Sequence, residues 1–209
     1  MIEQATASRE REQTRERILR VGARIIHRKG FNNAGIQEIL QEAGIPKGSF
    51  YYYFQSKKDF GLQVIEYYES QLLKLLQKHM ARLDLPPLER LRLYFRDIRA
   101  GLEKESCRGG CPVGNLAQEM ADLDESFRNR LNWTFRSLRN GFAEALEEAA
   151  ERGDLGLAQS PTELAEFIMS SLQGSILQVK VAKSTEPLKR FEKLVFNRIF
   201  ACPEEGQET

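Results

Sequence analysis

The stretch "IQEILQEAGIPKGSFYYYF", from Ile36 to Phe54, predicts a short helix, a glycine turn and a second short helix rich in aromatic residues. The first helix, over about 36–43, has the i, i+3, i+4, i+7 apolar spacing of one helix face, at Ile36, Ile39, Leu40 and Ala43. Gly44 suits the positive φ of a tight inter-helix turn, and Pro46 is tolerated at a helix start. The stretch therefore has the length and the turn of a helix-turn-helix.

The second helix, expected over about 47–54, divides its rings between two faces. At 100° per residue, Phe50, Tyr53 and Phe54 share one face, which we expect to point into a core. Tyr51 and Tyr52 fall on the outer arc together with Gly48 and Ser49. We expect the outer tyrosines to donate hydrogen bonds to phosphate oxygens and to lay their rings against sugars or thymine methyl groups.

Helical periodicity continues along the rest of the chain, and strand alternation is nearly absent. Thr14 is expected to cap a first helix that ends near Lys29, and Ser56 a long helix with Asp59 as its capping-box partner. The further helices are expected over 56–83, 87–105, 113–121, 124–152, 161–183 and 186–201. The predicted fold is all-α, with a small three-helix head, a long connecting helix over 57–83 and a larger helical body; the tail 203–209 is expected to be disordered.

Composition limits the class of protein. The 209 residues are 41% hydrophobic and 29% charged, and no apolar run approaches the roughly 20 residues that span a bilayer. The N-terminus has no apolar segment of a secretory signal. Three cysteines are too few for a disulfide framework, so we expect a cytoplasmic protein. With two histidines, Cys107, Cys111 and Cys202 do not make a zinc site, and no metal or cofactor is expected.

Charge is distributed unevenly. Residues 1–58 carry 11 Lys and Arg against 6 Glu, a net of +5, whereas the whole chain carries only +1. A basic head on a mildly acidic body favours a polyanion as partner, although a solvated charged face would have the same composition. Lys57 and Lys58 occupy the first turn of the long helix, where the macrodipole disfavours cations, so we expect a phosphate to dock there. The alternative is that both are solvated surface lysines.

The segment "GFNNAGIQEILQEAGIPKGSFYYYFQSKKDF", Gly30 to Phe60, resembles the DNA-binding signature of TetR-family transcriptional regulators. The resemblance covers about residues 12–65 and implies a DNA-binding domain over 1–56 and a ligand-binding and dimerisation domain over 57–209. It implies DNA contacts from Lys47, Gly48, Ser49, Tyr51 and Tyr52, and a phosphate contact from Lys58. The family usually places Ser or Thr before the second helix; here Asn33 is expected to provide that cap and contact.

Two-fold symmetry is expected if two heads are to bind an inverted repeat. The last two predicted helices carry more apolar surface than one core-facing stripe needs, which favours a homodimer over a helix pair buried in a monomer. The candidate interface residues are Phe167, Ser171, Gly174, Ser175, Phe191, Val195 and Ile199. The resemblance also implies an inducer pocket in the body. Its candidate lining residues are Phe95, Met120, Trp133 and Phe135, although aromatic residues at helical spacing are more often plain core.

Cys111 stands in "SCRGGCPVGNLAQEM", directly before a predicted helix start, where the helix dipole lowers a thiol pKa. Cys107, four residues earlier, is a candidate resolving thiol. The segments "GCPVGNLAQE" and "QVKVAKSTEPL" are similar to TetR-family repressors that respond to electrophiles and reactive chlorine, which implies Cys111 as the sensing thiol with Lys180 as its partner. The alternative is an inert core cysteine.

The leading hypothesis is thus a homodimeric repressor that a small molecule or a cysteine modification releases from an inverted-repeat operator. An all-α enzyme is the first alternative, but the sequence has no nucleophile–base pair, phosphate loop or metal motif. A sequence-independent architectural DNA binder is the second, and it would need a broader basic surface than this head carries.

Overall fold

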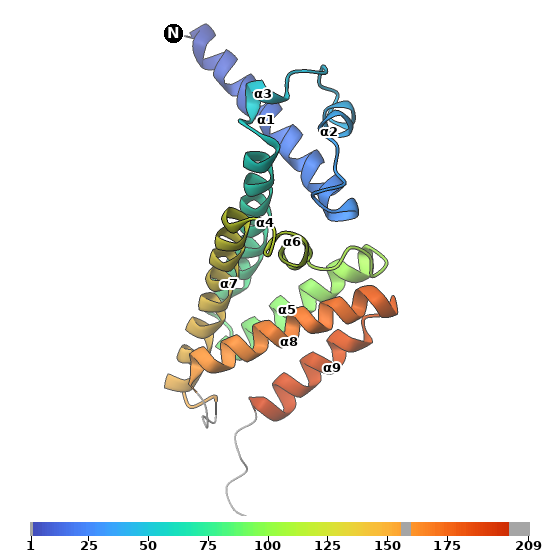
Figure 1. Cartoon of the computed structure of the whole chain (residues 1–209). Helices are drawn as coiled ribbons and strands as arrows, with labels where there is room; N and C mark the ends of the chain where they lie inside the picture. Colours follow the sequence, from blue (N-terminus) through green and yellow to red (C-terminus); the bar gives the residue numbers. More distant parts are fainter. Residues whose placement is uncertain (1, 156–159, 201–209) are drawn as a thin grey trace, which may run out of the picture. The chain divides into compact units, whose positions relative to one another are not determined.

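The computed structural model describes residues 2–155 and 160–200, with side chains from residue 8 onward. Over these residues the chain is helical and without strands, which confirms the predicted all-α class (Figure 1). Cys202 and the tail expected to be disordered lie outside the described residues. The helices are α1 (Ile2–Lys29), α2 (Ile36–Glu42), α3 (Phe50–Tyr53), α4 (Lys57–Met80), α5 (Pro87–Lys104), α6 (Pro112–Met120), α7 (Glu125–Glu151), α8 (Pro161–Ala182), α9 (Glu186–Leu194) and a π-helical turn, Val195–Ile199.

Two helices of the head differ from the prediction. The first begins at Ile2 and not at Thr14, because residues 2–13 are rich in good helix formers and contain neither Gly nor Pro. The helix expected over 47–54 begins only at Phe50, since Gly48 has a φ of +94° and interrupts any helix before it. Lys47 therefore lies in the turn before α3 and not on the helix.

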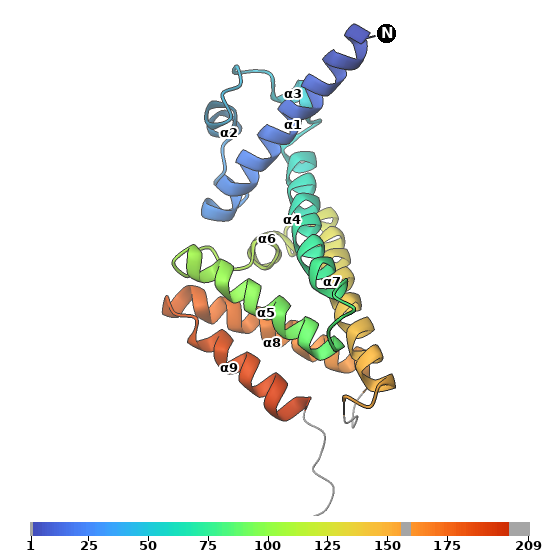
Figure 2. The same ribbon diagram turned by 180° about the vertical axis from the view of Figure 1, so that it is seen from behind.

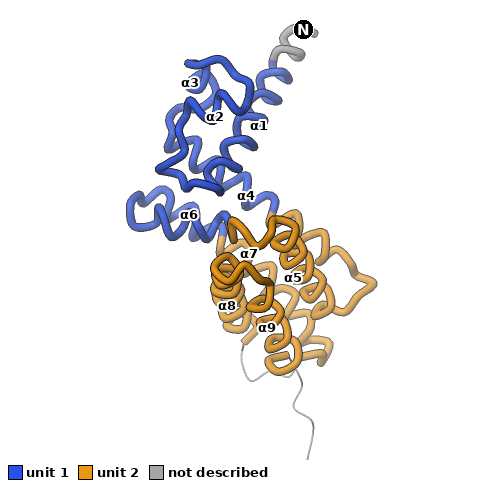
Figure 3. Tube along the Cα trace, turned by 90° about the vertical axis from the view of Figure 1, so that its right-hand side faces the viewer, with its two compact units in different colours: residues 1–71, 112–134 blue, residues 72–111, 135–209 orange. Residues whose placement is uncertain are grey.

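The chain divides into two compact units, residues 1–71 with 112–134 and residues 72–111 with 135–209 (Figure 3). The first unit contains α1, α2, α3 and α6 with the first parts of α4 and α7. The boundary predicted after residue 56 separates a DNA-binding domain from a ligand-binding and dimerisation domain. The two compact units do not test this functional boundary, so it stays a prediction.

The core of the first unit gathers around three phenylalanines. Phe50, Phe54 and Phe60 are at most 2% exposed, and their ring centroids lie 4.8–5.5 Å apart. Gly22 of α1 lies against the Phe60 ring so closely that a Cβ at this position would collide with it. The bulk of Phe60 thus explains why α1 has a glycine on its inner face.

In the second unit, α5, α8 and α9 lie side by side, as both ribbon views show (Figures 1 and 2). Its core includes a cluster of edge-on and tilted rings with centroids 5.3–6.0 Å apart, formed by Tyr94, Phe95, Phe142, Phe191 and Phe196. Ser160 caps α8 with Glu163 as its capping-box partner. The helix expected over 186–201 changes from α to π geometry at Val195.

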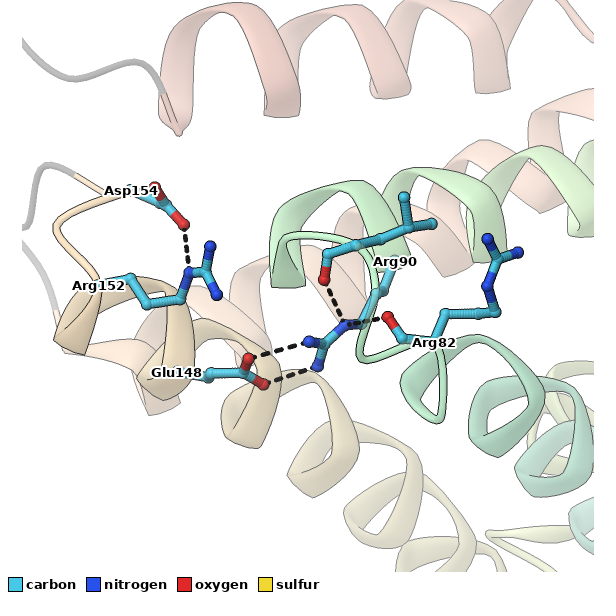
Figure 4. Close-up of polar contacts among 6 residues, drawn as sticks. Arg82, Arg90, Glu148, Arg152 and Asp154 are labelled. Atoms are coloured by element: carbon cyan, nitrogen blue, oxygen red, sulfur yellow. Dashed lines mark hydrogen bonds and ion pairs between the residues drawn. The ribbon is translucent and has the colours of Figure 1, made fainter.

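A buried arginine ties α5 to α7 within this unit (Figure 4). The Arg90 guanidinium is 4% exposed and donates to both carboxylate oxygens of Glu148, at 2.7 and 3.0 Å. Its Nε donates to the carbonyl oxygens of Arg82 and Leu85. This charge therefore has several acceptors although it is buried, as a stable buried ion requires.

Candidate nucleic-acid interface

The outer face of α3 presents two aromatic rings to solvent. Tyr51 is 68% and Tyr52 61% exposed, while Phe50 and Phe54 anchor the same short helix from behind. Tyr53, expected on the inner face, is half-buried. This division agrees with the helical-wheel prediction. Exposed aromatic rings held by a buried support are suited to contact a partner, because the rings bring large contact area on few rotatable bonds.

Arg11 of α1 is a member of this surface that the sequence did not reveal. Its guanidinium carbon lies 4.6 Å from the centroid of the Tyr52 ring, and one of its N–H groups donates to the Tyr52 carbonyl oxygen at 3.2 Å. The contact holds the Tyr52 ring from the side of α1 and places a positive charge beside it. Placing the first helix start at Thr14 left Arg11 outside any predicted helix.

The turn between α2 and α3 carries the remaining predicted contacts of the recognition segment. Lys47 and Gly48 are exposed, and Ser49 is half-buried at the N-cap position of α3 without a side-chain capping bond. A Cβ added to Gly48 would have no atom of a residue beyond its two chain neighbours within 4 Å, so the backbone at Gly48 is open on this side. A polyanion can therefore approach the backbone of this turn closely.

Asn33 does not cap α2 as expected. The N-cap residue of α2 is Gly35, which makes no side-chain capping bond, and the Asn33 amide instead donates to the carbonyl oxygen of Lys29 at 3.2 Å. Asn33 thus serves the C-terminal end of α1, because Ala34 and Gly35 separate it from the first turn of α2. The capping prediction was wrong, and the side chain is exposed beside the turn.

The two lysines at the start of α4 have protein partners. Lys57 donates to the Asn32 carbonyl oxygen at 3.1 Å, and its Nζ lies 5.0 Å from the centroid of the Phe31 ring. Lys58 forms an ion pair of 2.8 Å with Asp124, and this contact lowers the pKa of the Asp124 carboxyl below its ordinary value. In the free protein, the Asp124 carboxylate thus occupies the position beside Lys58 where the sequence predicted a phosphate.

Glu119 of α6 holds the turn between α1 and α2, a contact that no local pattern predicts. Its two carboxylate oxygens accept the backbone N–H groups of Phe31 and Asn32 at 2.7 and 2.8 Å. Gly30 has a φ of +87°, and a Cβ there would lie 2.8 Å from a Glu119 oxygen. The glycine therefore allows both the turn and the approach of the carboxylate.

The candidate sensor lies in the second unit, in the loop before α6. Cys107 is 7% exposed and belongs to the core of this unit, and Cys111 is half-buried against it. Gly110 faces Lys180 of α8, because a Cβ on Gly110 would lie 3.3 Å from the lysine Cδ. Burial, followed by the charge of Cys111, raises the pKa of Tyr94, so Cys111 and this buried phenol are electrostatic neighbours.

The proposed pocket residues fall into both units. Phe95 is fully buried in the ring cluster of the second unit, and Phe135 is half-buried against the same core. Met120 is buried and Trp133 is 59% exposed, and both belong to the first unit. Nothing in these positions assigns the four residues to one cavity.

Six of the proposed dimer residues come together on one face formed by α8, α9 and the π-helical turn. Phe167, Ser171, Ser175, Phe191, Val195 and Ile199 line an open groove of about 250 Å³. Phe167 and Leu194 at this groove are 51% and 52% exposed. Gly174 of α8 is exposed as well, with open space around it. Large apolar side chains thus remain uncovered in the single chain.

No described helix has both the length and the apolar character of a membrane span. Among the described residues, no three His, Cys, Asp or Glu side chains are grouped so that they could hold a metal ion.

Comparison with known proteins gives matches along most of the chain. Residues 18–64 match "Bacterial regulatory proteins, tetR family", and residues 87–195 match "Tetracyclin repressor-like, C-terminal domain". Transcriptional regulator AcuR of Cereibacter sphaeroides is 38% identical over 183 residues, which are 88% of this chain and 83% of AcuR. The crystal structure of regulatory protein TetR from Rhodobacter sphaeroides has a TM-score of 0.83 at 37% identity, covering 89% of this chain and 98% of that one.

The HTH-type transcriptional repressor NemR of Escherichia coli is 31% identical over 91% of this chain and 95% of its own length. The crystal structure of its reduced form has a TM-score of 0.78 at 29% identity, covering 91% of this chain and all of that one. Both the head and the body thus match regulators of one kind, and the chain belongs to the TetR family of bacterial regulatory proteins.

Proposed function

We propose that this chain is a homodimeric transcriptional repressor that binds an inverted-repeat operator in the cytoplasm and leaves it when a small molecule binds or Cys111 is modified. Family membership makes it a DNA-binding transcription regulator and not an enzyme. The observation that carries the proposal is the pair of exposed rings, Tyr51 and Tyr52, on the second helix of a helix-turn-helix beside Lys47 and Arg11.

In this proposal α3 enters the major groove of the operator. The Tyr51 and Tyr52 hydroxyls donate to phosphate oxygens while their rings lie against sugars or thymine methyl groups. Lys47 and Ser49 contact the backbone at the start of α3, and Gly48 lets the two backbones approach. Asn33, Lys57 and Lys58 contact phosphates at the edge of the site.

The groove between α8 and α9 supports the homodimer. Its residues Phe167 and Leu194 leave apolar surface in water that a second copy of the same face would cover. Two heads joined in this way would bind half-sites about 34–36 Å apart, one helical turn of DNA. Relatives such as NemR are named repressors, which supports repression over activation.

Release is proposed to start at Cys111. The thiol is half-buried in a loop that contains Gly109 and Gly110, and Gly110 lies against the Lys180 side chain. Cys111 itself packs against the core of the second unit. An added group on its sulfur would disturb this packing and would favour an arrangement with lower DNA affinity. Cys107, in the neighbouring core, is the proposed resolving thiol. An apolar inducer would contact Phe95 and Phe135 in the second unit, or Met120 and Trp133 in the first.

The test of DNA binding is a fluorescence anisotropy titration with a labelled duplex from the region upstream of the chain's own gene. We expect binding to survive a large excess of unrelated duplex and to weaken steeply as salt is raised. An architectural binder would lose the labelled duplex to the competitor in proportion to its amount. That result would contradict the proposal.

The test of the sensor is the same titration after treatment with N-ethylmaleimide, to which a thiol adds by forming a carbon–sulfur bond. The treated wild type is expected to release the duplex, and the Cys111→Ser variant to keep it. Cys107→Ser is the matched control and should still be released, since its thiol lies in the core. If wild type and Cys111→Ser release the duplex equally after treatment, Cys111 is not the sensor and has a purely structural role.

A further inference from the structure

The ion pair between Lys58 and Asp124 joins two helix starts within the first unit. Lys58 is the second residue of α4, and Asp124 directly precedes α7. The Lys58 Nζ lies 2.8 Å from Asp124 Oδ2, and the two side chains are 49% and 24% exposed. The pair is thus open to solvent and to any polyanion that reaches the start of α4.

The two carboxylate oxygens of Asp124 have separate partners. Oδ1 accepts the backbone N–H groups of Ser126 and Phe127 at 2.8 and 3.3 Å and so caps the first turn of α7. Oδ2 pairs with Lys58. The backbone of α7 therefore fixes the carboxylate in place, while the lysine has a long, flexible stem.

A cation in the first turn of α4 is unfavourable for the helix dipole unless an anion lies beside it. Asp124 supplies that anion in the free protein, and an operator phosphate would supply it in the complex. Exposed ion pairs are weak, so an exchange of one anion for the other involves a small net free energy. Lys58 can turn from Asp124 toward a phosphate by changing its rotamers alone.

We propose that Asp124 is an internal counter-ion that competes with operator phosphate for Lys58 and so lowers both the affinity and the salt sensitivity of DNA binding. The inference rests on the proposed function, because it takes DNA as the partner of Lys58. A lysine that is already paired must give up its carboxylate before it binds phosphate. The carboxylate then takes up a cation, which offsets part of the counter-ion release from DNA.

The separate roles of the two oxygens define the experiment. In Asp124→Asn the side-chain oxygen can still cap α7 while the negative charge facing Lys58 is removed. We expect this variant to bind the upstream duplex about 2- to 5-fold more tightly than wild type near physiological salt, the range of a weak exposed ion pair. The plot of log affinity against log salt should steepen by up to about 0.9, the value for one phosphate contact.

Two controls separate the pairwise exchange from a general change of charge. Glu125→Gln removes the neighbouring exposed acid, which pairs with Arg128, and should leave the salt slope unchanged. In a Lys58→Ala background, Asp124→Asn should have no further effect. Asp124→Ser, which also caps helices, repeats the test should the asparagine variant be unstable in thermal unfolding.

The outcomes discriminate between the two proposals. If Asp124→Asn binds DNA equally or less tightly than wild type, while operator preference over unrelated DNA is kept, the counter-ion proposal is overturned and the repressor proposal stands. An effect that persists in the Lys58→Ala background also overturns it, because the change is then long-range. If the wild type shows no preference for the upstream duplex, the proposed function itself fails.

Discussion

The exposed rings of α3 and the exposed apolar side chains of α8 and α9 differ in what surrounds them. On α3 the exposed groups are tyrosines, with Arg11 over one ring and Lys47 nearby. On α8 and α9 they are Phe167 and Leu194, flanked by small residues such as Ser171 and Ser175. The difference teaches that exposure alone does not identify a partner. Hydroxyls and cations around a ring favour a polyanion, whereas phenylalanine beside small residues favours a second apolar surface.

Among the substitutions that test this difference, Gly174→Glu is expected to have the largest effect on dimer formation and operator affinity. Gly174 has open space around it, so a glutamate fits the single chain and also improves helix propensity. Between two copies of the α8–α9 face it would bury a charge. We expect a monomer in sedimentation analysis, and a loss of operator affinity of at least about 100-fold because the second head no longer binds in the same complex.

The matched control is Gly101→Glu. Gly101 lies in α5, is exposed and has equally open surroundings. This variant should stay a dimer with unchanged operator affinity. A dimeric Gly174→Glu protein would show that the α8–α9 face is not the interface.

Removing the two hydroxyls of α3 comes next in size. The double variant Tyr51→Phe and Tyr52→Phe keeps the rings and loses two hydrogen bonds to phosphate. We expect operator affinity to fall about 10- to 100-fold, since hydrogen bonds to charged groups contribute more than neutral ones. Sedimentation and circular dichroism should match wild type, because neither hydroxyl supports the core. Unchanged operator affinity in anisotropy titrations would show that the two tyrosine hydroxyls do not contact DNA.

Phe167→Ser is expected to weaken the dimer and leave the subunit intact. The exposed ring contributes about 1.5–3 kcal/mol only when a partner buries it, so the dimer dissociation constant should rise about 10-fold or more. In the Gly174→Glu background, where no partner is expected, the same change should alter the free energy of unfolding by less than about 1 kcal/mol. A large loss of stability in that background would make Phe167 a core residue.

Arg11→Ala should have the smallest effect. The guanidinium over Tyr52 orders the ring and adds one positive charge, and an exposed cation–π contact contributes about 0.5–1 kcal/mol. We expect operator affinity to fall about 2- to 5-fold, with Arg11→Lys in between. Arg9→Ala, which removes an exposed cation on the same helix, is the comparison that isolates the contact with Tyr52.

The sequence predicted the features that arise from local periodicity. The all-α class, the helix-turn-helix and the two faces of α3 follow from apolar spacing, because a helix places every third or fourth residue on one side. The family followed from the segment Gly30–Phe60. Local pattern was less reliable at helix ends. It missed the first twelve residues of α1, which lack an apolar stripe, and it extended α3 through Gly48.

Contacts between distant segments lay beyond what the sequence alone can predict. Glu119 binds the backbone of Phe31, 88 positions away, and Asp124 pairs with Lys58. Neither contact produces a periodic pattern in the sequence, because each contact involves only one side chain and one partner residue or turn. Asn33 shows the reverse case: its residue type suits a cap, and the structure uses it at the end of α1 instead of the start of α2.

One measurement tests the central contrast directly. A photo-crosslinking phenylalanine analogue is placed at position 52 or at position 167, and each protein is irradiated in the presence of the labelled upstream duplex. We expect position 52 to form a protein–DNA adduct and position 167 to form a covalent dimer of the chain. DNA adducts from position 167, or none from position 52, would contradict the account.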